Sequence, residues 1–161
     1  MDARATAGLE TGATIRRLHY HAVMVQVLPM SDFLFAYGTL QPGFAPAEIA
    51  SAVSQLLPVG EAFVHGVLYD LGGHPGAVLD SSSQERIIGA VYQLPEDASV
   101  LAELDAYEEF DPAAPESSAY LRIFHHVTLA AGGALRCWVY VYNRDPASAP
   151  VIPGGRFRRC S

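Results

Sequence analysis

The sequence predicts an α+β fold, in which a mostly antiparallel, barrel-like sheet of about five or six strands carries two main helices on its outside. Apolar and polar residues alternate along several segments, as is typical of strands. Two segments instead carry apolar residues at helical spacing. Because the strands are not regularly separated by helices, the pattern disfavours a doubly wound parallel sheet. The length, 161 residues, is that of one ordinary domain.

The first strand and the first helix follow each other closely. Phe33–Tyr37 is a continuous apolar run, which predicts a strand buried on both faces and ended by Gly38. Pro46 and Glu48 suit the first turn of a helix, and Pro58 would end that helix. Its predicted buried face is formed by Ile49, Val53, Leu56 and Leu57.

Two more strands are predicted in the middle of the chain. Glu61–Leu71 alternates and predicts a strand, and Val78–Leu79 is a short apolar piece after a glycine-rich loop. Arg86–Leu94 predicts another strand. Gly89 interrupts it and indicates a bulge or a close approach of another backbone segment.

The last elements are a second helix and a hairpin. Pro95 is expected to begin the helix, with Glu96 and Asp97 in its first turn. The helix is expected to have ended by Asp111. Tyr120–Leu129 and Leu135–Tyr142 both alternate, and the Gly132–Gly133 pair between them predicts a tight turn.

The domain is expected to span residues 30–150, followed by a tail at 151–161. Residues 1–29 are weakly patterned and end in Pro29, whereas Met30 opens a segment that runs straight into the first strand. We therefore expect residues 1–29 to be a disordered arm or the product of a mis-assigned start codon. Their apolar stretch, Ala22–Val27, is too short for the core of an export signal.

Composition excludes several function classes. The net charge is −7, no lysine is present and no basic run exists, which disfavours nucleic-acid binding. No apolar run approaches the roughly 20 residues of a membrane helix. The two cysteines, Cys137 and Cys160, show no metal-binding spacing, and a reducing cytoplasm fits them best. We expect no metal and no cofactor, and the oligomeric state stays open.

Glu108 is the strongest candidate for chemistry. Val100, Leu101 and Leu104 precede it by eight, seven and four residues, so a helix that persists would place all four on one inward stripe. Glu109 would be rotated about 100° toward solvent. Desolvation and the helix C-terminus both raise the proton affinity of an inward carboxyl group, toward the range useful for acid/base catalysis. Alternatively, the helix ends earlier and Glu108 is an ordinary surface carboxylate.

The exit of the first strand is the second candidate. Gly38 allows a sharp turn and a close approach of a ligand, so the amide groups that follow could point into one concavity that suits a carboxylate or carbonyl oxygen. Alternatively, this is a plain turn between a strand and a loop.

Five blocks in order, from Phe33 to about Asn143, resemble the γ-glutamylcyclotransferase-like (AIG2-like) family. They read FAYGTLQPG, VHGVLYDLGGHPGAV, IIGAVYQL, LAELDAYEEF and YLRIFHHVTL followed by LRCWVYVYN. The resemblance implies that Glu108 is the catalytic acid, relaying a proton while the α-amine of a γ-glutamyl compound attacks its own γ-carbonyl. The products would be 5-oxoproline and an amine or amino acid. It also implies substrate binding by the backbone of Tyr37, Gly38, Thr39 and Leu40, with Tyr120 lining the pocket.

Two departures from the family leave the substrate open. Glu109 stands where the family commonly has glycine, and the segment from Asp111 to Ala119 is long. The alternatives are a non-catalytic module of the same fold that binds a small acid, and an enzyme that removes a γ-glutamyl protecting group in a biosynthetic pathway.

Overall fold

The computed structural model describes residues 32–159. The expectation for residues 1–29 and the position of Cys160 therefore lie outside the described residues. The strands are β1 (Phe33–Ala36), β2 (Leu57–Asp70), β3 (Pro75–Leu79), β4 (Arg86–Gln93), β5 (Tyr120–Leu129) and β6 (Ala134–Tyr142). The helices are α2 (Ala50–Val53) and α3 (Ala98–Tyr107), and two single 3₁₀ turns are η1 (Pro115–Ser117) and η2 (Pro153–Gly155).

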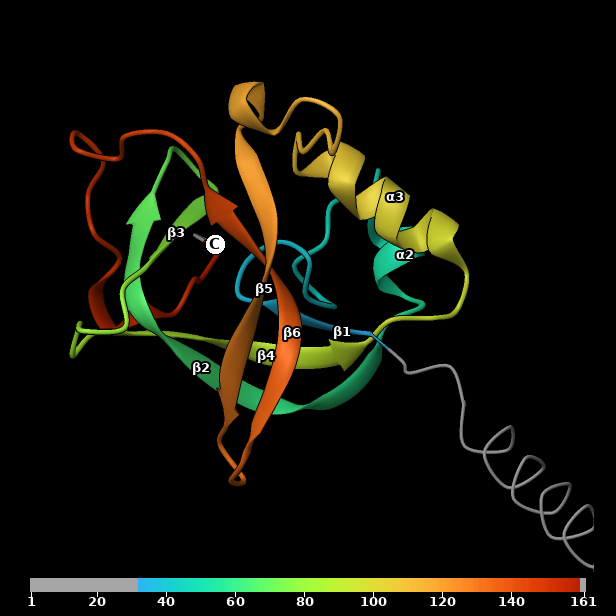
Figure 1. Cartoon of the computed structure of the whole chain (residues 1–161), viewed down its shortest axis with the longest axis horizontal. Helices are drawn as coiled ribbons and strands as arrows, with labels where there is room; N and C mark the ends of the chain where they lie inside the picture. The colour runs from blue at the N-terminus through green and yellow to red at the C-terminus, as the bar shows by residue number, and fades with distance from the viewer. Residues whose placement is uncertain (1–31, 160–161) are drawn as a thin grey trace, which may run out of the picture. The chain divides into compact units, whose positions relative to one another are not determined.

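Five of the strands close into a barrel (Figure 1). The sheet order is β3-β2-β4-β1-β6-β5, and β2 also pairs with β5, which joins the two ends of the five-strand set. β2 can pair with both β4 and β5 because it is 14 residues long and strongly curved (Figure 1). All pairings are antiparallel except β1 with β6. The predicted barrel-like α+β fold is confirmed.

Two apolar cores meet at β1, because its side chains alternate between the two sides of the sheet. Phe35 points into the barrel, where it packs against residues such as Ile87 and Val139. Leu34 points to the other side, toward α2 and α3, which lie together outside the barrel (Figure 1). The continuous apolar run of the first strand is thus explained by a core on each face.

The first helix is shorter than predicted. Regular α-helix covers only Ala50–Val53, and β2 already begins at Leu57. Leu57, which the helical spacing placed on a buried face, is 60% exposed. Pro58 lies within β2, where an irregularity in the pairing between Pro58 and Gly60 accommodates it. Sheet pairing with β4 has overridden the local helical spacing.

The second helix begins later than predicted. Asp97 is its N-cap, and the Asp97 carboxylate accepts a hydrogen bond from the amide of Ser99 at 2.9 Å. Glu96 and Asp97 therefore precede the first turn instead of lying in it. An aspartate at the N-cap satisfies an amide that the helix itself leaves free, which is why the helix starts here and not at Pro95.

The segment after β6 returns across β2 and β4. The amide of Asp70 donates to the carbonyl of Pro150, and that of Ile152 donates to the carbonyl of Leu68, both at 2.8 Å. Phe157 is buried in the barrel core. Described residues of the predicted tail thus contribute side chains to the barrel interior.

Gly89 marks a close approach of two strands. A Cβ atom at this position would lie 2.3 Å from the carbonyl oxygen of Ala36 in β1. This confirms the close backbone approach that the sequence indicated, whereas the irregularity in pairing falls on β2. Since β1 ends at Ala36, the glycine allows β4 to support the strand end that leads into the candidate site.

Gly89→Ala should destabilise the protein, because the new methyl group meets backbone atoms that cannot rotate away. We expect a loss of at least about 2 kcal/mol in the free energy of unfolding, measured by urea denaturation. Gly60→Ala is the matched control, since its Cβ would meet nothing within 4 Å. Equal stability of the two variants would contradict the close approach.

Candidate active site

A cavity of about 430 Å³ lies between the end of β1 and the C-terminal end of α3. The sequence-predicted site residues come together here, because all six of them line it. The lining comprises the segment Phe35–Leu40, His74, Pro75, Tyr107, Glu108, Glu109, Ala119, Tyr120, Tyr140, Tyr142 and Arg144.

Glu108 is the C-cap of α3, so the helix persists long enough to place it beside the cavity. Two hydrogen bonds form a Schellman motif around it: the amide of Glu109 donates to the carbonyl of Ala106 at 3.2 Å, and that of Phe110 to the carbonyl of Asp105 at 2.9 Å. The side chain of Glu108 is partly buried. Glu109 is exposed, as the sequence predicted.

Burial raises the pKa of Glu108 to about 7, and the neighbouring carboxylate of Glu109 adds to the effect. Among the hydrogen bonds of residues 32–159, none reaches the Glu108 carboxyl group, so no donor stabilises its charged form. A carboxyl group with this pKa exchanges protons readily near neutral pH, as a general acid/base catalyst must.

Glu109 occupies a backbone conformation that favours glycine. Its φ is +52°, the one positive value outside glycine among residues 32–159. This is the C′ position of the Schellman motif, where a left-handed residue ends the helix and glycine is preferred. The glycine that the family commonly has here is thus explained by the backbone, and glutamate is held in its place under strain.

The segment that follows β1 offers free amide groups. The amides of Gly38, Thr39 and Leu40 donate none of the hydrogen bonds found within residues 32–159. Gly38 has no positive φ, but a Cβ there would lie 2.7 Å from the side chain of Pro75. The glycine is therefore needed for close packing against Pro75 and not for an unusual turn, which corrects the reason inferred from the sequence.

Five tyrosines line the cavity, and the hydroxyl groups of three of them form hydrogen bonds that connect its walls. The Tyr37 hydroxyl donates to the carbonyl of Tyr140 at 2.5 Å, and the Tyr120 hydroxyl donates to the carbonyl of Pro75 at 2.9 Å. The Tyr107 hydroxyl lies 3.1 Å from the Thr39 hydroxyl and links α3 to the free-amide segment. Burial and the nearby Glu108 raise the pKa of Tyr37 and Tyr120, so both stay protonated.

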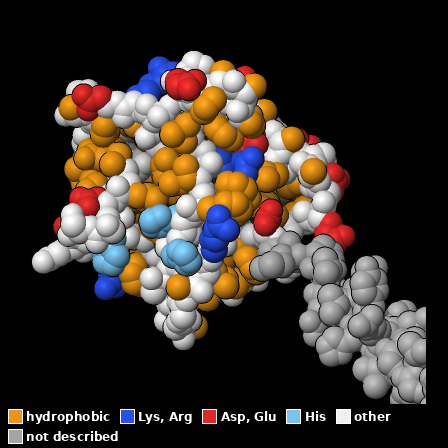
Figure 2. Space-filling view, in the orientation of Figure 1, with side chains coloured by type: hydrophobic (Ala, Val, Ile, Leu, Met, Phe, Trp, Pro, Cys, Tyr) orange, Lys and Arg blue, Asp and Glu red, His pale blue; other side chains and the backbone are white. Residues whose placement is uncertain are grey.

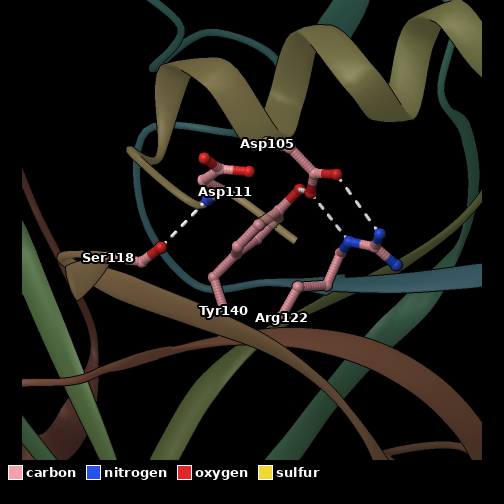
Figure 3. A network of polar contacts seen from close by, with 5 residues as sticks. All are labelled: Asp105, Asp111, Ser118, Arg122 and Tyr140. Atoms are coloured by element: carbon pink, nitrogen blue, oxygen red, sulfur yellow. Dashed lines mark hydrogen bonds and ion pairs between the residues drawn. The ribbon is translucent and has the colours of Figure 1, made fainter. Parts of the chain in front are cut away.

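Sequence reasoning missed the buried carboxylate of Asp105. It accepts hydrogen bonds from Arg122 of β5 and Tyr140 of β6 (Figure 3). The sequence did contain a signal for its burial. Asp105 lies four residues after Leu101 and three before Glu108, on the same inward stripe of the helix. An acid on an apolar stripe predicts a buried partner.

The rim of the cavity carries both signs of charge. Arg144 and His74 are exposed there, as is Glu109. Residues 32–159 contain no cluster of side chains suited to hold a metal ion. No helix in this part of the chain is long and apolar enough to cross a membrane. Cys137 is buried in the barrel, as the sequence predicted for a core residue.

Replacement of Glu109 by glycine should stabilise the protein, because glycine adopts a positive φ without steric strain. We expect Glu109→Gly to exceed Glu109→Ala by about 1 kcal/mol in the free energy of unfolding. Both variants remove the carboxylate, so their difference isolates the backbone effect. Urea unfolding of the pair measures it, and a more stable alanine variant would contradict the left-handed conformation.

Stability should depend on pH through Glu108. Its carboxyl group binds a proton more tightly in the folded state than in the unfolded state, so stability is lost as pH rises from about 4.5 through about 7. Glu108→Gln stays neutral over this range. We compare the free energy of unfolding of Glu108→Gln with that of the unmodified protein at each pH. The difference should shift in favour of the variant by up to about 3 kcal/mol between pH 4.5 and pH 8.

Urea unfolding at the two pH values tests this, with Glu103→Gln on the exposed side of α3 as the control for the chemical change. If Glu108→Gln and the unmodified protein differ in free energy of unfolding by the same amount at both pH values, the pKa of Glu108 is not raised.

Solved structures share this fold. The chain resembles YkqA from Bacillus subtilis, with a TM-score of 0.59 and 22% identity, over 80% of this chain and 40% of that one. It resembles an AIG2-like protein from Mus musculus, with a TM-score of 0.62 and 20% identity, over 81% of this chain and 90% of that one. The chain thus spans less than half the length of YkqA and most of the mouse protein.

The sequence comparisons agree with this fold. A curated relative from Halalkalibacterium halodurans, named "Putative gamma-glutamylcyclotransferase", is 33% identical over 95 residues, which are 58% of this chain and 78% of the relative. The sequence profile of the family described as "Gamma-glutamyl cyclotransferase, AIG2-like" matches residues 34–159. The resemblance found in the sequence is confirmed, and the chain belongs to the gamma-glutamyl cyclotransferase, AIG2-like family.

Proposed function

We propose that this chain is an enzyme that cyclises the γ-glutamyl group of a γ-glutamyl amine or γ-glutamyl amino acid to 5-oxoproline and releases the amine. One observation carries the proposal: the partly buried carboxyl group of Glu108, with its pKa raised to about 7, lines the same cavity as three unpaired amides. The family membership and the curated relative support the same class of activity.

The free amides of Gly38, Thr39 and Leu40 are suited to the α-carboxylate of the glutamyl group. Consecutive amides that point into one concavity form an anion site, because their dipoles add. Glu108 would then face the α-ammonium group and the γ-amide of the same substrate. A glutamyl chain bent in this way brings its own nitrogen close to its γ-carbon, and holding that conformer supplies much of the rate enhancement.

Glu108 acts first as a base and then as an acid. Its carboxylate takes a proton from the α-ammonium group, and the freed amine attacks the γ-carbonyl carbon to form the new C–N bond. Glu108 then returns its proton to the nitrogen of the original amide, whose C–N bond breaks. The ring nitrogen gives up its second proton to the departing amine, which leaves as an ammonium ion. The enzyme is unchanged after one turnover. The nucleophile belongs to the substrate, so the protein supplies no nucleophilic side chain.

Burial gives Glu108 its affinity for that proton. A carboxyl group with an ordinary pKa would be a weak base toward an ammonium group, whereas a pKa near 7 reduces the mismatch. Tyr37 and Tyr120 stay neutral, so they add no negative charge that would repel the substrate carboxylate. The cytoplasm remains the proposed compartment and a small γ-glutamyl compound the proposed partner.

Glu108→Gln should lower the rate of 5-oxoproline release by about 10²–10⁴-fold, because the amide keeps the shape but cannot relay a proton. The measurement is a screen of γ-glutamyl amines and γ-glutamyl amino acids with 5-oxoproline as the readout. In the unmodified protein, kcat/KM should fall as pH drops below about 7, where Glu108 becomes protonated in the free enzyme.

Glu103→Gln is the matched control, since it makes the same change on the exposed side of α3. Full activity of Glu108→Gln would refute the assignment. Tight binding of γ-glutamyl compounds without any turnover by the unmodified protein would favour a non-catalytic binding module instead.

A further inference from the structure

A buried carboxylate joins α3 to the barrel. Arg122 donates to Asp105 through both Nε and Nη2, at 2.7 Å and 3.2 Å, and the Tyr140 hydroxyl donates to Asp105 Oδ1 at 2.7 Å. Figure 3 shows Asp105 pointing from α3 toward the strands, with Arg122 and Tyr140 reaching up to it. Asp105 is only 8% exposed.

The guanidinium group of Arg122 also contacts an aromatic ring. It lies 4.1 Å from the ring centre of Trp138, and Trp138 stacks on Phe124 at 3.4 Å. These side chains belong to β5 and β6, which cross the front of the molecule in Figure 1. Figure 2, in the same orientation, shows arginine and histidine side chains among apolar ones on this face. Arg122 therefore has little freedom to move away from Asp105.

Stability alone does not explain this ion pair. The desolvation of two buried charges offsets most of their attraction, and well-packed apolar residues in such a place are commonly as stable. The ion pair instead fixes how its two side chains lie relative to each other, because a bidentate contact sets both their distance and their orientation. Asp105 and its two partners thus define how α3 lies against β5 and β6.

Asp105 and Tyr140 also form backbone hydrogen bonds on the two sides of the cavity, one at the turn that carries Glu108 and one beside the free-amide segment. The backbone carbonyl of Asp105 accepts the amide of Phe110, the bond that closes the turn carrying Glu108. The backbone carbonyl of Tyr140 accepts the hydroxyl of Tyr37, which directly precedes the free-amide segment. The hydrogen bond between Tyr140 and Asp105 therefore connects the acid/base residue with the amides.

We propose that Asp105 and Tyr140 are positioning residues, whose contact sets the distance between the Glu108 carboxyl group and the amides of Gly38–Leu40. The catalytic meaning of this contact rests on the proposed function, but the positioning itself can be measured without turnover. A misplacement of a catalytic group by about 1 Å can cost about 10²-fold in rate. Tyr140 also lines the cavity, but the role proposed for both residues is to hold Glu108 and the amides in place and not to contact the reacting atoms.

Tyr140→Phe is the sharpest test, since it removes one hydroxyl group and leaves the ion pair between Asp105 and Arg122 in place. We expect kcat for 5-oxoproline release to fall by about 10–100-fold, because the proton relay is misplaced. KM should change less than about threefold, because the amides remain available. Asp105→Asn is the second variant and should lower kcat further, since it weakens both contacts.

Amide hydrogen exchange gives a readout that does not depend on activity. In Tyr140→Phe, the amides of Glu108 and Phe110 should exchange at least tenfold faster, whereas Leu129, whose amide bonds to Gly133 in the hairpin, should be unchanged. Glu61→Gln, which breaks the exposed ion pair with Arg156, is the control for loss of a distant contact.

The outcomes separate the two proposals. Unchanged kcat together with unchanged exchange at Glu108 and Phe110 would overturn the positioning role. Faster exchange throughout the protein would also overturn it, since that result indicates a general stabilising role. If the unmodified protein turns over no γ-glutamyl compound, the proposed function fails, and the exchange measurement still decides whether Tyr140 holds the turn.

Discussion

The C-terminal turn of α3 is the constraint on which the candidate site depends. It must place a carboxyl group beside the cavity, reduce its contact with water, leave it without hydrogen-bond donors, and keep it close to the end of β1. The Schellman bonds set the backbone of this turn. Burial then raises the pKa of Glu108, because no described donor compensates the lost hydration. Acid/base chemistry near neutral pH follows from these local facts.

The barrel supplies the other half of the site. β1 is held in its centre, between β4 and β6, and its last residues have a core on either face. The chain must leave the sheet directly after such a strand, which exposes amides that have lost their ladder partners. Gly38 permits this exit to pack against Pro75. A rigid strand end and a rigid helix end thus face each other across one cavity.

Ending α3 directly after Glu108 requires a strained backbone at Glu109. A left-handed residue is needed to end α3 immediately after Glu108, and here that residue is glutamate with a φ of +52°. Strained backbone of this kind is concentrated at functional sites in proteins. Its carboxylate also helps to raise the pKa of Glu108, so the strain and the electrostatic effect come from the same residue.

Much of this could be predicted from the sequence, because the signals were local. Alternation marked β2, β5 and β6, and the apolar stripe of α3 placed Glu108 inward. The short α2 could not be predicted, since pairing with β4 draws Leu57 and Pro58 into β2 against their helical spacing. The contacts of Asp105 depend on how three elements meet, which no local pattern encodes.

The proposed chemistry requires that Glu108 is a desolvated acid with a pKa near 7. Titration of its side-chain carboxyl carbon by nuclear magnetic resonance, with ¹³C-labelled glutamate and the Glu108→Gln variant for assignment, tests this directly. We expect a midpoint at about pH 7 for this signal. A midpoint near 4.5, the value of an ordinary glutamate, would contradict it.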